Sequence, residues 1–407
     1  MTRQIREFVA AHHAQQIDFL AALVQQPSDN PPGDCAPHAE RAAQLLAQLG
    51  FTVERDPVPQ DVARAAGMVS ATNLIVRERF GSGPVIALNA HGDVVPPGLG
   101  WSTEPYGAQI REGVMYGRGV AVSKSDFATY AYALLALKAA RVPLAGTVEL
   151  HFTYDEETGG EIGPKRLLQT GLSKPDYAIS AGFSYGITTA HNGCLHLEVE
   201  VTGKSAHAAR PDTGIDALEA AVGILADLYN WRKTLAARRS TFPGIESPTL
   251  VVGLISGGIN TNVVPDSVKF RIDRRIIPDE DPQRAELELG EQLAAFAAKW
   301  PLVKCTTRRI LLAAPLTPIA GQERLVEALQ RHAREVLGET IAAHGVPIYT
   351  DARHYRAAGV PVVLYGAGPR TLLEANGHRA DEKLKLDDLR KATEIVASAL
   401  ADLLQPR

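Results

Sequence analysis

The sequence predicts an α/β fold in which a smaller α+β domain interrupts a larger domain with a mixed, largely parallel sheet. Short apolar runs alternate with helical runs up to about residue 193 and again from about residue 312, which favours a sheet flanked by helices. Between these regions, strands alternate between apolar and polar residues, as half-exposed antiparallel strands do. We therefore expect a discontinuous catalytic domain of residues 1–193 and 312–407, and an inserted domain of residues 194–311.

Composition and charge exclude several function classes. The chain has 407 residues, of which 45% are hydrophobic and 22% are charged, which is ordinary for a globular protein with two domains. With 42 basic and 46 acidic residues, the net charge of −4 indicates no nucleic-acid or anionic membrane partner. The three cysteines are scattered without CxxC spacing, and the charged N-terminal segment does not resemble a signal peptide. We expect a cytoplasmic protein with reduced thiols.

The first domain begins with a helix over about residues 3–25, which must end before the prolines and glycine of "PSDNPPGD". A second helix over 36–50 ends on Gly50, a common helix stop. Further helices are expected at 126–141 and 163–171, and the expected strands are "TNLIVRE", "VIALNAH", "TVELHFTYD" and "YAISA".

The inserted domain reads as strand, helix, two strands, helix and strand. This order predicts a compact α+β domain with an antiparallel sheet. Its elements include "CLHLEVEVTGKS", a helix over 214–238, "TLVVGLISGG", "SVKFRIDRRI" and a helix over 281–300. The α/β pattern then returns with a helix over 324–338, the strand "PVVLYGAG" and a helix over 386–404.

Two clusters of chemically active residues follow predicted strands. In "LNAHGDVVPPG", His91 and Asp93 suit a metal-binding imidazole oriented by a carboxylate, although a solvated loop histidine is an equal alternative. In "TYDEETGGEIG", three adjacent acids (Asp155, Glu156 and Glu157) would repel one another unless a cation or a proton is nearby. The alternative for these acids is an N-terminal cap of the helix that follows.

Two further clusters lie in loops. His378 precedes the last helix in "ANGHRADEKL", while His207 and Asn262 lie in "GKSAHAARPDTGIDALEA" and "GGINTNVVPD" of the inserted domain. By itself, each is equally well explained as a loop residue with local hydrogen-bond partners.

Taken together, these motifs resemble the M20 metallopeptidase and amidohydrolase family, which includes acetylornithine deacetylase, succinyl-diaminopimelate desuccinylase, aminoacylase and carboxypeptidase G2. The resemblance covers nearly the whole chain in order, through "LVQQPSDNPPGD", "HGDVVP", "GRGVAVSK", "DEETGG", "AHNG", "GKSAHAARPDTGIDALEA", "GGINTNVVPD", "TDARHY" and "GHRADE". It implies a zinc-exopeptidase-like catalytic domain and a ferredoxin-like lid domain that forms a homodimer interface.

The resemblance also implies roles for the catalytic-domain residues. His91 would bind one zinc ion with Asp93 as its orienting partner, and Glu157 and His378 would bind the second. Glu156 would be the general base that activates the attacking water.

Three further roles concern the substrate. His207 of the partner subunit would stabilise the oxyanion, and Asn262 would contact the substrate from the lid. Arg353, in "TDARHY", would hold a substrate carboxylate through its planar guanidinium group.

Two metal ligands of the family pattern are absent. The family turn is approximately G-R-G-x-x-D-x-K-G, and aligning "GRGVAVSK" places Val122 where its metal-bridging Asp belongs. A second carboxylate is expected in "DYAISAGFSYGITTAHNG", where Ala181 or Gly182 stands instead. Two dications about 3.5–4 Å apart need a bridging carboxylate, so the usual dinuclear centre is not expected.

Three outcomes are open for the metal. One Zn²⁺, Mn²⁺ or Co²⁺ could be held by some of His91, Glu157 and His378. Asp126, one helical turn beyond Val122, could instead replace the lost ligand, although an acid at a helix N-terminus is the simpler explanation. Otherwise the centre binds no metal.

The sequence therefore favours an M20-type hydrolase of an amide or related C–N bond in a small carboxylate-bearing N-acyl amino acid or short peptide. One alternative is a metal-independent lyase or isomerase that uses Glu156 and histidines as acid and base. The other is a non-catalytic protein that binds a carboxylated ligand.

Overall fold

The computed structural model describes residues 2–406 and divides them into two compact units. Unit 2 consists of Ala190–Thr317 and Gly345–Tyr349, and unit 1 contains the described residues before, between and after these segments. The expected boundaries at 193/194 and 311/312 lie near these. Segment 345–349, expected in the first domain, groups with unit 2, where the Gly345 amide donates to the Pro243 carbonyl oxygen at 2.7 Å.

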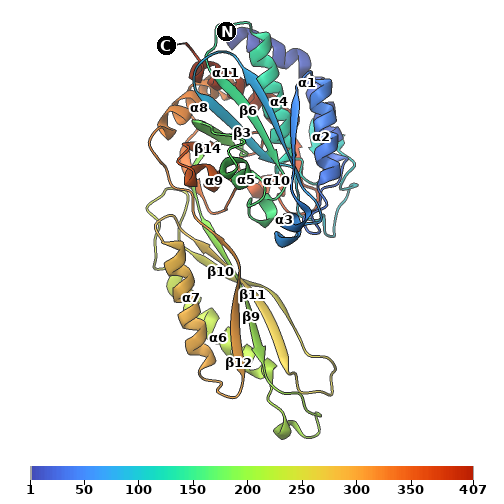
Figure 1. Ribbon diagram of the computed structural model, residues 1–407, viewed down its shortest axis with the longest axis vertical. Helices are drawn as coiled ribbons and strands as arrows, with labels where there is room; N and C mark the ends of the chain where they lie inside the picture. Colours follow the sequence, from blue (N-terminus) through green and yellow to red (C-terminus); the bar gives the residue numbers. More distant parts are fainter. Residues whose placement is uncertain (1, 407) are drawn as a thin grey trace. The chain divides into compact units, whose positions relative to one another are not determined.

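Unit 1 is built on an eight-stranded mixed sheet with the strand order β1-β2-β6-β3-β7-β14-β8-β13 (Figure 1). Strand β3 is parallel to both of its neighbours, β6 and β7, so the carboxyl ends of these three strands meet at one edge. The strands are β1 (Val53–Pro57), β2 (Thr72–Arg79), β3 (Val85–His91), β6 (Thr147–Thr153), β7 (Tyr177–Ser180), β8 (Ile187–His191), β13 (Ala343–Val346) and β14 (Val362–Leu364).

Helices cover this sheet and bury its apolar side chains. Helix α4 packs against α1 and α11, α11 also packs against α8, and α5 packs against α9 (Figure 1). The helices of unit 1 are α1 (Thr2–Val24), α2 (Ala36–Gln48), α3 (Gln60–Ala65), α4 (Lys124–Ala139), α5 (Pro164–Gln169), α8 (Gln322–Leu337), α9 (Ala352–Ala357), α10 (Leu372–Ala375) and α11 (Leu386–Leu403). Every residue of α4 from Lys124 to Leu134 is buried, including the polar residues of its first turns such as Lys124 and Asp126.

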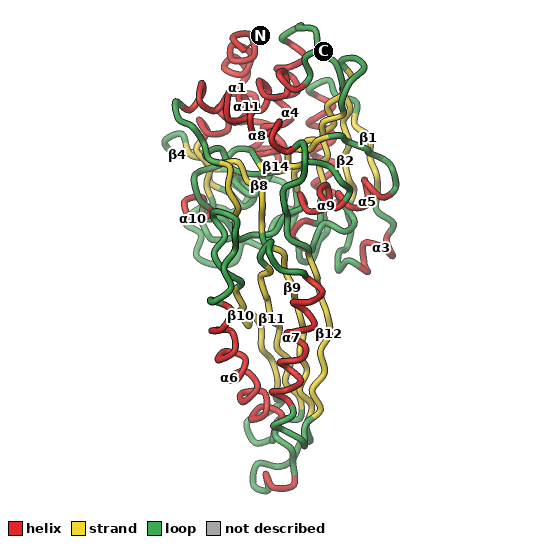
Figure 2. The backbone as a smooth tube through the Cα atoms, turned by 90° about the vertical axis from the view of Figure 1, so that its left-hand side faces the viewer, coloured by secondary structure: helices red, strands yellow, loops and turns green. Residues whose placement is uncertain are grey.

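Unit 2 is a four-stranded antiparallel sheet with the order β10-β11-β9-β12 and two helices (Figure 2). Its elements are β9 (Gly193–Thr202), α6 (Ala217–Leu235), β10 (Thr249–Gly257), β11 (Ser267–Ile276), α7 (Pro282–Ala297) and β12 (Lys304–Ala313), which is the predicted ferredoxin-like order. Asp216 and Asp281 begin the two helices by accepting hydrogen bonds from the backbone amides of Leu218 and Arg284.

The alternation of β9 gives the sheet of unit 2 two different faces. Leu195, Leu197, Val199 and Val201 are buried in the apolar core with α6 and α7. The residues between them therefore lie on the other face of the sheet.

Short elements are the ones that the sequence analysis missed. They include the helices α3, α9 and α10 and the strands β8 and β13, as well as several short polar strands. Strand β1 has the sequence VERDP, and the three-stranded sheet β15-β5-β4 consists of β4 (Gln109–Arg111), β5 (Val114–Tyr116) and β15 (Lys383–Lys385). Strands of three to five residues with few apolar positions carry too little periodicity to be recognised. Their pairing with neighbouring strands determines them.

Among residues 2–406, no helix combines the length and the apolar character that crossing a membrane requires. The three cysteines are thiols, of which Cys35 and Cys194 are buried and Cys305 is half-buried.

Candidate metal and catalytic centre

His91 is the last residue of β3 and lies at the edge where the parallel strands end. Its side chain is buried, and its Nδ1 lies 3.0 Å from the backbone oxygen of Asp93 and 3.4 Å from the Asp93 carboxylate. This contact fixes the ring so that its Nε2 is the nitrogen open to a metal ion.

Asp93 organises the loops around it. Its carboxylate is fully buried and accepts hydrogen bonds from the backbone amides of Glu156 and Glu157 at 3.3 and 3.1 Å, and from the side-chain amide of Asn30 at 2.9 Å. Asp93 thereby joins the end of β3 to the loop after β6. Asn30, which lies in "PSDNPPGD", was not singled out from the sequence because an asparagine in a proline-rich loop has many local uses.

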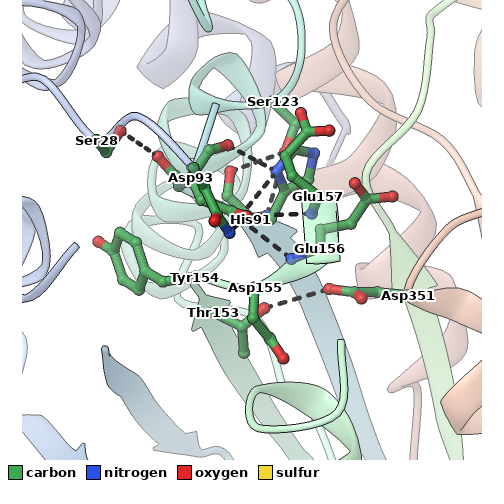
Figure 3. Close-up of polar contacts among 12 residues, drawn as sticks. Ser28, His91, Asp93, Ser123, Thr153, Tyr154, Asp155, Glu156, Glu157 and Asp351 are labelled. Atoms are coloured by element: carbon green, nitrogen blue, oxygen red, sulfur yellow. Dashed lines mark hydrogen bonds and ion pairs between the residues drawn. The ribbon is translucent and has the colours of Figure 1, made fainter. Parts of the chain in front are cut away.

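Glu156 and Glu157 begin a short 3₁₀ turn that starts three residues after the end of β6, next to His91 (Figure 3). One ligand atom each from His91, Glu156 and Glu157 lies within 4.8 Å of the other two. The Nε2 of His378 lies 3.3 Å from a carboxylate oxygen of Glu157. The structure thus brings together four residues from three segments that lie far apart in the sequence.

The electrostatics of this cluster reflect concentrated negative charge. Burial, together with the Glu157 and Asp93 carboxylates, raises the pKa of Glu156 to about 7, although His91 and His378 oppose this. Burial disfavours charge on His91, but Glu156, Asp93 and Glu157 outweigh it and raise the His91 pKa well above its usual value. The hydrogen bond to Glu157 raises the pKa of His378. Such a site attracts cations.

The side chains grouped here are ones that bind divalent metal ions. His91, Glu156 and Glu157 form the group whose ligand atoms lie within 4.8 Å of one another, and His378 is joined to it through its contact with Glu157. Two imidazoles and one carboxylate are a set that catalytic zinc uses. His378 has a backbone φ of 61°, a left-handed conformation that is uncommon outside glycine and is concentrated at functional sites.

Val122 and Ala181, the residues that the sequence analysis aligned with two metal ligands of the family, lie in apolar surroundings. Val122 and Ala181 are both partly buried and pack against the main core of unit 1. Glu382 holds the turn that carries Val122, because its Oε1 accepts from the backbone amides of Ala121 and Val122 at 3.0 and 3.1 Å. Its Oε2 pairs with Arg118 at 2.6 Å. Glu382 therefore links the turn of Val122 to Arg118 and to the loop of His378.

Asp126 contacts the segment in which the sequence analysis expected the second carboxylate. Its carboxylate is fully buried and accepts from the backbone amides of Gly182 at 3.1 Å and Ala367 at 2.8 Å. Burial raises its pKa well above the usual value, although the two hydrogen bonds and His91 act in the opposite sense. Asp126 is not part of the group formed by His91, Glu156 and Glu157, so its role as a replacement ligand stays a prediction.

Helix α9 supports the loop that carries Glu156 and Glu157. Arg353 and His354 both contact the Gly159 carbonyl oxygen, His354 at 2.9 Å, and Arg353 lies 3.4 Å from Glu161. The Arg353 side chain is only 8% exposed. Its expected contact with a substrate carboxylate stays a prediction, while its observed partners hold the loop.

Asp351 packs tightly below the same loop. Its carboxylate accepts from the Thr153 hydroxyl at 3.4 Å (Figure 3). A Cβ at Gly160 would come within 2.1 Å of Asp351, so glycine is needed there for this close approach. Burial and the neighbouring Glu156 and Asp155 raise the pKa of Asp351 well above its usual value.

His207 and Asn262 lie in unit 2, and both side chains are exposed. The Ala208 amide donates to the Asn262 carbonyl oxygen at 3.0 Å, which joins their two loops. The Nδ1 of His207 accepts from the Ala209 amide at 3.0 Å, so the neutral ring carries its proton on Nε2.

Comparison with known proteins places this centre in a family. A model described as peptidase family M20/M25/M40 matches residues 87–402. The chain is 28% identical over 369 residues to an acetylornithine deacetylase from Myxococcus xanthus, which covers 90% of this chain and 91% of that protein.

Two solved structures share the fold at low sequence identity. The di-peptidase Dug1p from Saccharomyces cerevisiae has a TM-score of 0.81 at 17% identity, with 98% of both chains covered. The metallo-carboxypeptidase Sso-CP2 from Sulfolobus solfataricus has a TM-score of 0.76 at 17% identity, with 95% of this chain and 98% of that chain covered. Since the family model spans most of the chain, the protein is an enzyme that belongs to peptidase family M20/M25/M40.

Proposed function

We propose that the protein hydrolyses the amide bond of a small N-acyl amino acid or short peptide that carries a carboxylate. The observation that carries this proposal is the position of Glu156, a half-buried carboxylate whose pKa is raised to about 7, beside a set of metal-binding side chains. A base with a pKa near the working pH both accepts and returns protons efficiently. The acetylornithine deacetylase and di-peptidase named above support the substrate class.

Glu156 carries the proton in this reaction. Its carboxylate removes a proton from the attacking water while the water oxygen forms a bond to the amide carbon. The protonated Glu156 then donates this proton to the leaving nitrogen as the C–N bond breaks. Asp93 positions the base, because it holds the backbone amides of Glu156 and Glu157.

We further propose a centre with one metal ion, Zn²⁺ or alternatively Mn²⁺ or Co²⁺, held by His91, Glu157 and His378. When bound, such an ion supplies Lewis-acid polarisation of the substrate carbonyl and lowers the pKa of water. The proposal of one ion is supported by the apolar packing of Val122 and Ala181, which offers no carboxylate to bridge a second.

A homodimer completes the proposed machinery. His207 of the partner subunit would donate from Nε2 to the oxyanion of the tetrahedral intermediate, which the observed acceptor role of its Nδ1 supports. Asn262 would contact the substrate beside it, and Arg353 would hold the substrate carboxylate if its side chain rotates from Gly159. Mixing His207→Ala chains with Glu156→Gln chains should restore measurable activity. A confirmed heterodimer without recovery would exclude the cross-subunit role of His207.

The hydrolase proposal is tested with a panel of N-acetyl and N-succinyl amino acids and dipeptides. We expect release of the free amine from at least one of them, its loss on treatment with a chelator, and its recovery with Zn²⁺, Mn²⁺ or Co²⁺. Chelator-resistant turnover that requires Glu156 would instead identify a metal-independent acid–base enzyme. Ligand binding without turnover would identify a binding protein.

A further inference from the structure

A second group of metal-binding side chains lies in unit 2. Cys194 and His196 are two residues apart on β9, so both point to the face of the sheet away from the apolar core. The register of β9 with β11 places Asp273 directly opposite His196. Thiol, imidazole and carboxylate groups therefore meet on one sheet face.

The distances in this group are short. One ligand atom each from Cys194, His196 and Asp273 lies within 4.8 Å of the other two. The His196 Nε2 is 3.1 Å from one Asp273 carboxylate oxygen, and the Cys194 Sγ is 3.8 Å from the other. The His196 and Asp273 side chains are 31% and 29% exposed, so ions in solution can reach them, whereas Cys194 lies at the buried base of the group.

Arg275 lies beside Asp273 and Cys194, the two members of this group that can carry a negative charge. Its guanidinium donates to both Asp273 oxygens, at 3.0 and 3.1 Å, and the strand register places it directly opposite Cys194. A guanidinium beside a thiol favours the thiolate, which is the form that binds metals. A carboxylate ligand that is itself hydrogen-bonded is also typical of metal sites.

We propose that Cys194, His196 and Asp273 bind one divalent transition-metal ion, with zinc the best match to the donor set. A thiolate sulfur and an imidazole nitrogen select zinc and similar ions over Mg²⁺ or Ca²⁺, which take oxygen ligands. Three protein ligands leave a fourth position for water. The ion would link β9 to β11, and the site would be separate from the M20 centre, so this proposal does not depend on the proposed hydrolysis.

The rival explanation is an ion-pair network without metal, because the Asp273 carboxylate already pairs with His196 and Arg275. The two explanations differ in whether Cys194 takes part. The proposal also changes how a measured metal content would be interpreted. Two ions per chain could be one ion in each site, so such a result would not require a dinuclear M20 centre.

Co²⁺ is the probe that separates the two sites, because a cobalt–thiolate bond gives a near-ultraviolet charge-transfer band and the M20 centre contains no cysteine. We expect the reduced full-length protein to develop this band on titration with Co²⁺, up to one equivalent. Cys194→Ser should abolish the band, and His196→Gln should weaken the affinity by about 10-fold or more. Cys305→Ser, a half-buried cysteine on the neighbouring strand β12, is the matched control and should leave the band unchanged.

A His378→Gln/Glu157→Gln variant should keep the cobalt–thiolate band, since those residues belong to the other site. The proposal is overturned if the folded wild-type protein gives no band at excess Co²⁺. It is equally overturned if the band survives Cys194→Ser. Either result leaves the proposed hydrolase intact, which chelator-sensitive turnover tests separately.

Discussion

Glu156→Gln is expected to lower kcat by about 10²–10⁴-fold, the range that a positioned general base contributes. The substitution keeps the size and burial of the side chain but removes its ability to accept a proton. KM for a hydrolysed substrate should change little, because Glu156 acts on water rather than on the bound substrate. Steady-state kinetics with the best substrate of the panel measure both quantities.

Glu161→Gln is the matched control, because Glu161 lies in the same loop but pairs with Lys165 and Arg353 instead of facing the cluster. It should keep most of the activity. A Glu156→Gln enzyme with near wild-type kcat, when folded and loaded with metal, would remove Glu156 from the catalytic role.

The pH profile gives a second measure of the same residue. A general base works only when ionised, so kcat/KM should fall as the pH drops through the Glu156 pKa. Without a bound cation this pKa is raised to about 7, mainly by burial, and a nearby cation lowers it. The acidic inflection of the metal-loaded enzyme is therefore expected at or below about pH 7.

Loss of Glu157 is expected to have the second-largest effect, on metal binding. Glu157 contacts His378 and belongs to the group with His91 and Glu156, so Glu157→Gln removes the carboxylate that joins the two histidines. Metal affinity at this centre should fall by more than about 100-fold, since loss of supporting groups alone costs about 10–100-fold. Calorimetric titration in a Cys194→Ser background isolates this centre from the site proposed in unit 2.

The same titration tests the number of ions. The Cys194→Ser protein should bind one ion, and adding Val122→Asp, which restores a carboxylate at the family's bridging position, should produce a second binding event. Binding of two ions before Val122 is changed would show that another residue, with Asp126 the first candidate, supplies the missing ligand. Unchanged metal affinity in Glu157→Gln would exclude Glu157 as a ligand.

The sequence by itself determined the fold class and most of its elements. The interrupted α/β pattern predicted a sheet flanked by helices with an inserted α+β segment. The expected strand "VIALNAH" coincides with β3 (Val85–His91). This strand is buried on both sides, so its mainly apolar sequence is a strong signal. Family membership, indicated by motifs spread over the chain, was confirmed by the family match.

The sequence also predicted that two metal ligands of the family are missing. A motif specifies which residue type is expected at a position, so Val122 and Ala181 could be proposed as departures without a structure, and this stays a prediction. What fills the space around them could not be recognised, because that depends on segments distant in the chain. Glu382, which holds the turn of Val122, lies about 260 residues away from it.

The tertiary structure alone decided which polar groups meet. Parallel pairing of β3 with β6 placed His91 beside the Glu156–Glu157 turn, and antiparallel register placed Asp273 opposite His196. The packing of distant segments also supplies the two backbone amides that donate to Asp126, and it brings the Arg353 guanidinium to the Gly159 carbonyl oxygen. The order of residues along the chain does not specify how far apart remote segments lie in the fold. Strand register and close packing supply those distances, and with them the charges and pKa values on which the chemistry depends.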